Sequence, residues 1–110
     1  MTLLQQLERE RSSAREELRQ KRRAELRRAL SQLLPGTRVI VFGSLTKSGR
    51  FNEFSDIDLA LETEPAGLSI YQLTARLMEE MGCGVDVVLL DESRFRNRIL
   101  AEGEEWILSA

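Results

Sequence analysis

The sequence predicts a small domain of the α/β (α+β) class, with a mixed β-sheet flanked by helices and a long helix at its N-terminus. Three observations support this prediction. Residues 2–34 contain no Pro or Gly and are rich in strong helix formers. After residue 35, short β-branched apolar runs alternate with helical stretches. A chain of 110 residues has room for one domain with one modest core.

The long helix at 2–34 carries two apolar patches. Its last two turns have an apolar face at helical spacing, formed by Leu26, Ala29, Leu30 and Leu33. A second patch near its start consists of Leu3, Leu4 and Leu7. The middle, Arg19–Arg23, is too polar to be buried. We therefore expect one long helix or two, with the first half docked on another surface or partly frayed.

Two strands and a loop are expected next. Pro35-Gly36 forms a turn, and the β-branched and aromatic run 38–42 then predicts a buried strand. Residues 43–55 form a loop, with room for a short helix from Ser44, and residues 56–62 form a second strand.

The remaining elements are predicted from apolar stripes and breakers. A helix is expected over 68–81, and Gly82-Cys83-Gly84 ends it. A third, buried strand follows over 85–90. Asp91 or Ser93 is then expected to cap a helix that runs to about Ala101. Gly103 breaks that helix, and residues 106–108 add a short last strand.

The composition excludes several classes of protein. The apolar runs are too short to cross a bilayer and no apolar secretory segment begins the chain, so we expect no membrane association and a cytoplasmic location. The single cysteine, Cys83, rules out an internal disulfide. There is no histidine, which removes Ser-His-Asp and Cys-His catalysis and imidazole metal ligands.

The charges are distributed unevenly along the chain. Residues 1–34 hold nine Arg or Lys and five Asp or Glu, a sum of +4, whereas residues 35–110 hold seven and thirteen, a sum of −6. We accordingly divide the chain into an N-terminal helical arm at 1–34 and a domain at 35–110. The basic arm is suited either to an anionic partner such as nucleic acid or to a solvated helix with internal i,i+4 ion pairs.

Two aspartates on the second strand indicate chemistry. Residues i and i+2 of a strand point to the same face, so Asp56 and Asp58 present paired carboxylates while Ile57 faces the core. Like charges side by side destabilise a strand, and a bound Mg²⁺ or Mn²⁺ removes that repulsion. The alternative is that Asp56 caps a turn and Asp58 meets solvent.

The third strand adds one more carboxylate. Asp86 is the single charged residue in the apolar run 85–90, and buried carboxylates are rare unless they are paired or bind metal. If this strand pairs beside the second, Asp86 completes a cluster of three carboxylates with Asp56 and Asp58. The alternative is an exposed Asp at the first turn of the strand. Asp91 is interpreted as a helix cap and not as a ligand.

A Gly-Ser pair follows the first strand. Gly43 allows close backbone approach, and the hydroxyl and free N–H groups at Ser44 are suited to phosphate oxygens. Lys47 and Arg50 in the same loop can neutralise a triphosphate.

Together these motifs resemble the nucleotidyltransferase superfamily related to DNA polymerase β. The motif "FGS" at 42–44, "DID" at 56–58 and "VDVVLL" at 85–90 carry the resemblance. The small size resembles the minimal nucleotidyltransferase (MNT) branch, whose members often serve as antitoxins of HEPN-type toxins. Eleven residues separate Gly43-Ser44 from the first Asp, where family members commonly have ten.

The resemblance implies a polymerase β palm-like fold and a set of roles. Asp56, Asp58 and Asp86 would be catalytic and would hold two Mg²⁺ ions, with Mn²⁺ as an alternative. Gly43, Ser44 and Lys47 would bind the nucleoside triphosphate, ATP. The reaction would move AMP to an acceptor hydroxyl and release pyrophosphate.

The expected acceptor is a partner protein, because only twenty residues follow Leu90 and leave little surface to hold another acceptor. In the resemblance this partner is a HEPN-type ribonuclease toxin that AMP transfer silences. Two alternatives stay open: an antitoxin that masks its toxin by binding alone, and an adenylyltransferase for a small molecule or an RNA end. RNA is less favoured because the basic stretch 19–28 lacks interleaved aromatic residues.

Overall fold

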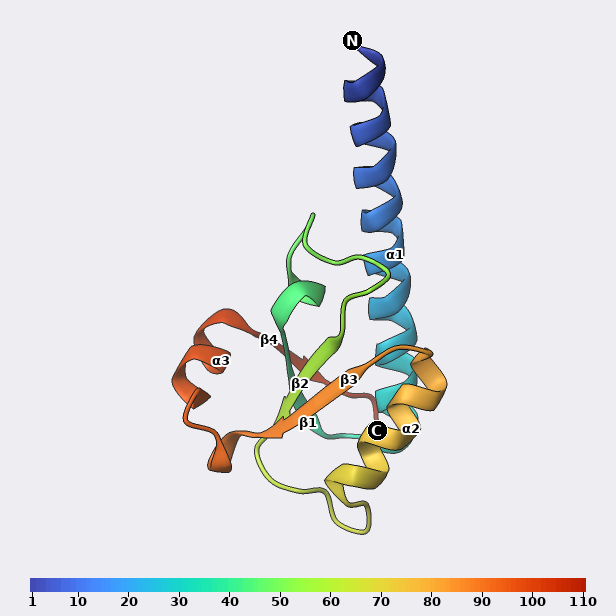
Figure 1. Ribbon diagram of the computed structural model, residues 1–110. Helices are drawn as coiled ribbons and strands as arrows, with labels where there is room; N and C mark the ends of the chain where they lie inside the picture. Colours follow the sequence, from blue (N-terminus) through green and yellow to red (C-terminus); the bar gives the residue numbers. More distant parts are fainter.

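Three helices, two short 3₁₀ helices and four strands make up the fold, which a computed structural model describes for all residues 1–110 (Figure 1). The elements in chain order are α1 (Leu3–Leu33), β1 (Arg38–Phe42), η1 (Gly43–Thr46), β2 (Ile57–Leu61), α2 (Ile70–Met81), β3 (Val85–Leu89), η2 (Leu90–Glu92), α3 (Arg96–Glu102) and β4 (Glu104–Ile107). The predicted class and the predicted order of elements are confirmed.

The four strands form one mixed sheet in the order β3-β2-β1-β4. β1 pairs antiparallel with both β2 and β4, while β2 and β3 run parallel. Parallel neighbours need a crossover connection, and α2 supplies it. One expectation was wrong: β3 is an edge strand, so three of its residues are only half-buried and Asp86 is exposed. Its apolar run packs on both faces, with Val87 and Leu89 against the larger core and Val88 against a second cluster, but the edge position leaves these side chains only partly buried.

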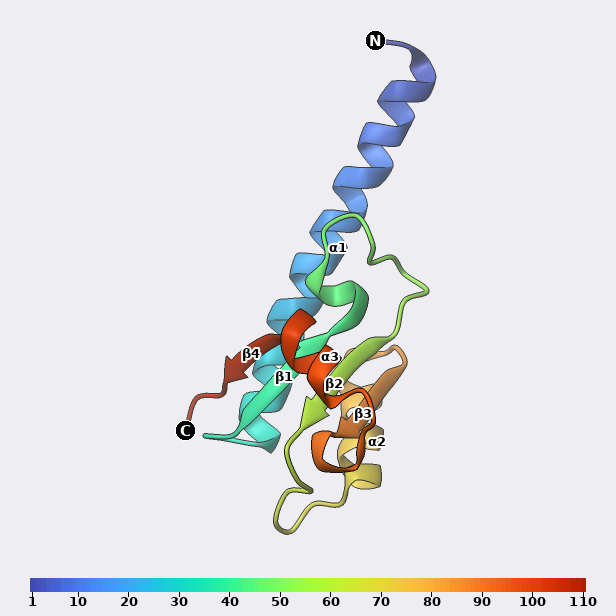
Figure 2. The same cartoon turned by 90° about the vertical axis from the view of Figure 1, so that its left-hand side faces the viewer.

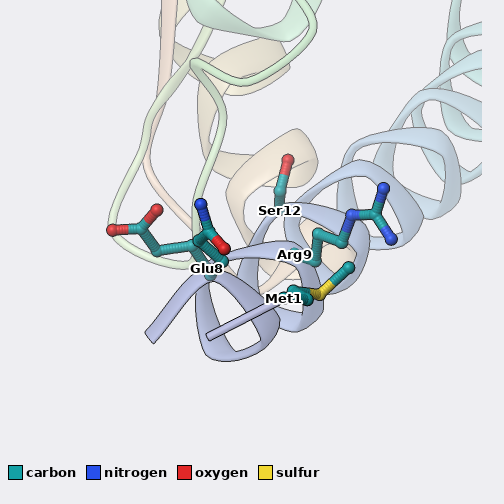
Figure 3. A pocket seen from close by; sticks show the side chains of 5 residues that line it. Met1, Glu8, Arg9 and Ser12 are labelled. Atoms are coloured by element: carbon teal, nitrogen blue, oxygen red, sulfur yellow. The ribbon is translucent and has the colours of Figure 1, made fainter. Parts of the chain in front are cut away.

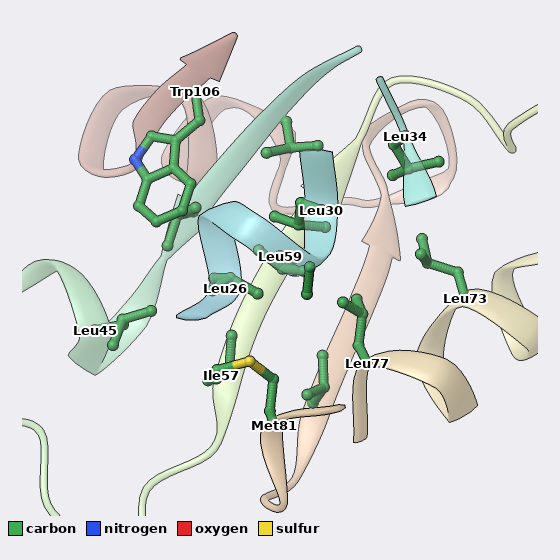
Figure 4. Close-up of a cluster of buried hydrophobic side chains, with 14 of the residues drawn as sticks. Leu26, Leu30, Leu34, Leu45, Ile57, Leu59, Leu73, Leu77, Met81 and Trp106 are labelled. Carbon is green, nitrogen blue, oxygen red and sulfur yellow. The ribbon is translucent and has the colours of Figure 1, made fainter. Parts of the chain in front are cut away.

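Helices cover both faces of the sheet. α1 and α2 lie on one side, and α3 lies on the other (Figures 1 and 2). The larger core fills the α1/α2 side, where side chains of α1, α2, β1 and β2 meet (Figure 4). A smaller cluster under α3 consists of Ile40, Ala60, Leu90 and Ile99. Alternation along β2 divides its side chains between the two faces, with Ile57, Leu59 and Leu61 in the larger core.

The N-terminal helix is continuous, and its first half projects beyond the sheet (Figures 1 and 2). It begins with a capping box in which Thr2 and Gln5 exchange hydrogen bonds. Leu3 and Leu4 are 74% and 66% exposed, so this patch does not dock on the rest of the chain. The second half closes the core with Leu26, Ala29 and Leu30.

The prediction that Arg19–Arg23 is too polar to be buried was wrong for its first residue. Arg19 is only 9% exposed. Its guanidinium donates to the carbonyl oxygen of Leu45 and pairs with Glu16. A carbonyl and a carboxylate therefore replace the water that this charge loses.

The helix caps also differ from expectation. α2 begins with a capping box between Ser69 and Gln72, two residues later than predicted. Neither Asp91 nor Ser93 caps α3, which begins at Arg96 without a side-chain cap. Asp91 instead lies 3.2 Å from Arg96 in an ion pair. The sheet is completed by β4, which begins two residues earlier than predicted. No helix combines the length and the apolar character that crossing a membrane requires.

Leu30→Ala and Leu4→Ala form a matched pair that tests which part of α1 is packed. Leu30 is fully buried, and its truncation should lower the free energy of unfolding by about 2–5 kcal/mol. Leu4→Ala should change it by less than about 0.5 kcal/mol because Leu4 is exposed. Urea unfolding measures both values. Equal losses would contradict the conclusion that the first half of α1 is not packed against the rest of the chain.

Candidate active site

The register of the two parallel strands places two carboxylates side by side. Asp58 of β2 lies opposite Asp86 of β3. On the other side of β2, Asp58 lies opposite Phe42, the residue that precedes the Gly-Ser turn. Asp56 stands just before β2 begins. The predicted convergence of the first, second and third strands is therefore present in the structure.

Strand alternation sends these carboxylates to the face that α3 covers. Ile57 and Leu59 of β2 fill the core against α1 and α2, so Asp58 between them faces the other way. The same alternation places Val85 in that core and Asp86 on the opposite face. The burial of the apolar neighbours thereby fixes the direction of the carboxylates.

Two glycines lie directly against the carboxylates. Gly43 has a φ of +74°, and a Cβ there would collide with Oδ2 of Asp58. A Cβ at Gly84 would collide with Oδ1 of Asp56. Gly43 was predicted from its place after β1. Gly84 was interpreted only as part of a helix end, since nothing local in the sequence indicates its contact with Asp56.

The surroundings of Asp58 destabilise its ionised form. Partial burial raises its pKa from 3.8 to about 6, and the negative charges of Asp86 and then Asp56 add to the rise. The folded chain therefore holds a proton on Asp58 more tightly than the unfolded chain does. A positive charge beside Asp58 would stabilise its ionised form.

A cavity of about 510 Å³ opens between this sheet face and α3. Asp58 and Asp86 line it together with Gly43 and Lys47. Ser44 and Arg50 do not belong to its wall. The Ser44 carbonyl instead accepts a hydrogen bond from the Lys47 N–H at 3.1 Å, inside the turn. The cavity is in the size range of sites for small organic ligands.

Phe95 and Arg98 complete the cavity and were not predicted. Phe95 is 52% exposed, and its ring faces a cavity that also holds the aspartates. Arg98 comes from α3 and pairs with Glu102 at 3.4 Å. The sequence shows only that Phe95 stands near the start of a helix. Its place in the cavity depends on how α3 folds back over the sheet.

The donor set is suited to a divalent cation. Carboxylate oxygens are the ligands that Mg²⁺ prefers, and like charges around Asp58 call for a cation. The oxygens do not converge as a preformed cluster of three ligands. The carboxylate of Asp56 lies toward Gly84 and that of Asp58 toward Gly43, so the side chains are splayed apart. The residues fit an ion that draws them together.

A second hollow lies on the projecting first half of α1 and is lined by Met1, Gln5, Glu8, Arg9 and Ser12 (Figure 3). All of these side chains come from the exposed first turns of α1. No other element provides a wall, and no aspartate of the sheet is near. This hollow is therefore a feature of the helix surface and not part of the site.

The comparison with known families agrees with this arrangement. The family model described as nucleotidyltransferase domain matches residues 23–106, well over half of the chain. The chain therefore belongs to the nucleotidyltransferase domain family, and the superfamily that its motifs resemble is confirmed. Members of this family transfer nucleotidyl groups. A comparison with curated proteins gave no match.

Asp58→Asn tests the stressed carboxylate. With a folded pKa of about 6 and an ordinary value of 3.8, the contribution of Asp58 to stability is full below pH 4 and is lost as the pH rises through 6. Relative to wild type, Asp58→Asn should gain on the order of 1 kcal/mol between pH 4 and pH 7.5 in urea unfolding without metal. Asp91→Asn, which removes an ion-paired aspartate, should show no such gain. A pH-independent effect of Asp58→Asn would refute the assigned pKa.

Gly43→Ala tests the contact between glycine and carboxylate. Gly67 has the same φ of +74° but nothing within 4 Å of its missing Cβ, so Gly67→Ala should cost only about 1–2 kcal/mol of backbone strain. Gly43→Ala should cost at least about 1 kcal/mol more, because it also displaces Asp58. In an Asp58→Ala background this excess should vanish. An excess that persists there would place the clash elsewhere.

Proposed function

We propose that this protein moves AMP from ATP to a hydroxyl group of a partner protein in a Mg²⁺-dependent reaction, and that the partner is a HEPN-type ribonuclease toxin. One observation carries the proposal. The pair Asp58 and Asp86 shares a cavity with Gly43 and Lys47. A cation site thus adjoins groups suited to phosphate, and this combination is what nucleotidyl transfer needs.

Separate roles are assigned to the side chains that line the cavity and to Asp56, which does not line it. Asp56, Asp58 and Asp86 would hold Mg²⁺, which when bound neutralises the triphosphate and lowers the pKa of the acceptor hydroxyl. The glycine backbone at 43 lets phosphate oxygens approach the turn, and Lys47 adds a positive charge beside them. The acceptor oxygen bonds to the α-phosphorus, and pyrophosphate leaves.

The far wall of the cavity is suited to the nucleoside. Phe95 offers a partly exposed aromatic ring on which a base can stack. Arg98 on the same side adds a charged donor. Of the two exposed carboxylates, Asp56 and Asp86, only Asp86 lines the cavity, so we place it nearest to an acceptor that arrives from solvent.

The free arm supports a protein as the acceptor. Leu3, Leu4 and Leu7 are exposed on the projecting half of α1, and no other part of the chain covers them. An apolar stripe on a helix is a common docking surface for another protein. We assign this surface to the partner toxin, which would bring its hydroxyl to the cavity.

Within the basic stretch 19–28 of α1, most arginines are already engaged by other side chains, which disfavours this stretch as a binding surface for an RNA acceptor. Arg19, Arg22 and Arg23 are paired with Glu16, Glu25 and Glu104. Arg27 stacks over the ring of Trp106 at 4.2 Å from its centroid. Few of these charges are free to bind phosphates. Masking of a toxin without catalysis stays a second candidate, because the exposed leucines of the arm would suffice for it.

The decisive experiment follows the α-phosphate. The protein should transfer label from α-labelled ATP with Mg²⁺ to a protein in a lysate of the native host. The Asp56→Asn/Asp58→Asn double variant should lose more than about a hundredfold in rate, since it loses both charge stabilisation and positioning. Asp91→Asn is the matched control and should transfer at the wild-type rate.

Other outcomes point elsewhere. Labelled RNA with a steep salt dependence would replace the protein acceptor by RNA. Without any label, retained toxin binding and protection by the double variant would establish masking. A melting temperature that does not rise on adding Mg²⁺ and ATP would count against nucleotide binding itself.

A further inference from the structure

The middle of α1 grips the loop that carries Lys47. Nε of Arg19 donates to the Leu45 carbonyl oxygen at 2.9 Å, and Nη1 of Arg23 donates to the same oxygen at 3.2 Å. On the other side of Lys47, the Ser48 hydroxyl donates to Oε2 of Glu16 at 3.1 Å. The loop is thus held two residues before Lys47 and one residue after it.

The grip is a connected set of charged groups. Oε1 of Glu16 lies 2.7 Å from Nη1 of Arg19, so the two gripping side chains also fix each other. The pKa of Glu16 is lowered, chiefly by a hydrogen bond from Gln20; burial opposes this, and the hydrogen bond from Ser48 and the charge of Arg19 lower the pKa further. Nη2 of Arg23 forms an ion pair with Oε2 of Glu104 at 2.7 Å. Because Arg19 is buried, loss of its partners would leave a charge without hydrogen bonds.

Between residues 47 and 56 the loop has one buried anchor, Phe51, which lies four residues beyond Lys47. Beyond η1, residues 47–56 contain no helix or strand, and Lys47 is exposed on a long flexible stem. Inside the turn, the Thr46 hydroxyl bonds to the Gly43 carbonyl at 2.7 Å, so movement of one end is passed to the other. Leu45 itself is fully buried, which anchors its side chain while Arg19 and Arg23 fix its carbonyl.

Two of the gripping residues lie outside the matched family domain. The match begins at residue 23, and Glu16 and Arg19 precede it. The contacts of Glu16 and Arg19 are therefore made by the part of α1 that precedes the matched residues, while Arg23 is the first of these. They connect this part of α1 to Leu45 and Ser48, the residues on either side of Lys47 in the loop.

We propose that Arg19 and Glu16 are positioning residues that hold the Leu45–Ser48 segment so that Gly43 and Lys47 meet the nucleotide phosphates. The proposal rests on the proposed function, because it assigns the turn to phosphate binding. It adds that nucleotide affinity depends on side chains that never touch the nucleotide.

The test uses the full-length protein and the affinity for ATP with Mg²⁺, measured by calorimetry. Arg19→Ala and Glu16→Ala should each weaken the affinity about five- to tenfold, because the loop must be ordered on binding. Arg19→Lys keeps a donor for the Leu45 carbonyl and should recover part of the loss. Arg15→Ala removes an exposed arginine one turn earlier and should bind as wild type does.

A second readout separates positioning from general stability. Amide hydrogen exchange at residues 45–48 should speed up in Arg19→Ala and Glu16→Ala, while exchange in the β1–β2 ladder stays as in wild type. In the transfer assay, KM for ATP should rise more than kcat falls. If Arg19→Ala unfolded, the exposed Glu16–Ser48 contact would still be tested by Glu16→Ala.

The possible failures can be told apart. Wild-type affinity in both Arg19→Ala and Glu16→Ala would overturn the positioning role and leave the proposed function intact. Faster exchange throughout the sheet, with no selective change at 45–48, would make Arg19 a residue of general stability and also overturn it. If wild-type protein itself bound no ATP, the proposed function and the positioning role would fall together.

Discussion

The parallel pairing of β2 and β3 sets the position of the carboxylates around which the site is arranged. In its register Asp58 lies opposite Asp86, and a shift by one residue would turn one carboxylate into the core. The register is held by apolar side chains on the other face, where Ile57, Leu59 and Val85 pack against the helices. Hydrophobic burial therefore determines where the negative charges stand.

The two faces of the sheet thus have opposite energetic roles. Full burial of one leucine or isoleucine contributes about 1.5–3 kcal/mol. The repulsion and desolvation at Asp58 cost on the order of 1 kcal/mol at neutral pH. β2 alone places Ile57, Leu59 and Leu61 in the core. The free energy gained by burying these three side chains therefore exceeds the cost of the charged Asp58 on the other face. The strand stays formed with its carboxylates charged.

Local patterns in the sequence predict most of this fold and part of its site. Alternation in β2 and β3 predicts the sheet face that Asp58 and Asp86 take, because side-chain direction in a strand depends only on its own residues. Strand order is different. Nothing in the run 85–90 indicates that β3 is an edge strand of the sheet. The sequence therefore predicts a buried strand and a buried Asp86, whereas Asp86 is exposed.

The misses share a physical cause, since each depends on a partner far away in the sequence. Arg19 is buried because the carbonyl of Leu45, 26 residues later, accepts its hydrogen bond. Phe95 reaches the cavity because α3 packs back over β1. Composition marks Arg19 as a solvated charge and Phe95 as one more apolar residue. Only the tertiary fold brings Arg19 to the Leu45 carbonyl and Phe95 to the cavity.

The same distance dependence explains how the site is assembled from separate parts. The carboxylates are positioned by the sheet, the Gly43-Ser44 turn follows β1, and the loop with Lys47 is held by α1. Each part rests on a different packing surface. A defect in α1 at Arg19 can then loosen the loop while β2 and β3 keep their register. On the proposed function, binding of nucleotide and placement of metal ligands would then be separable properties of this small domain, although one cavity would serve both.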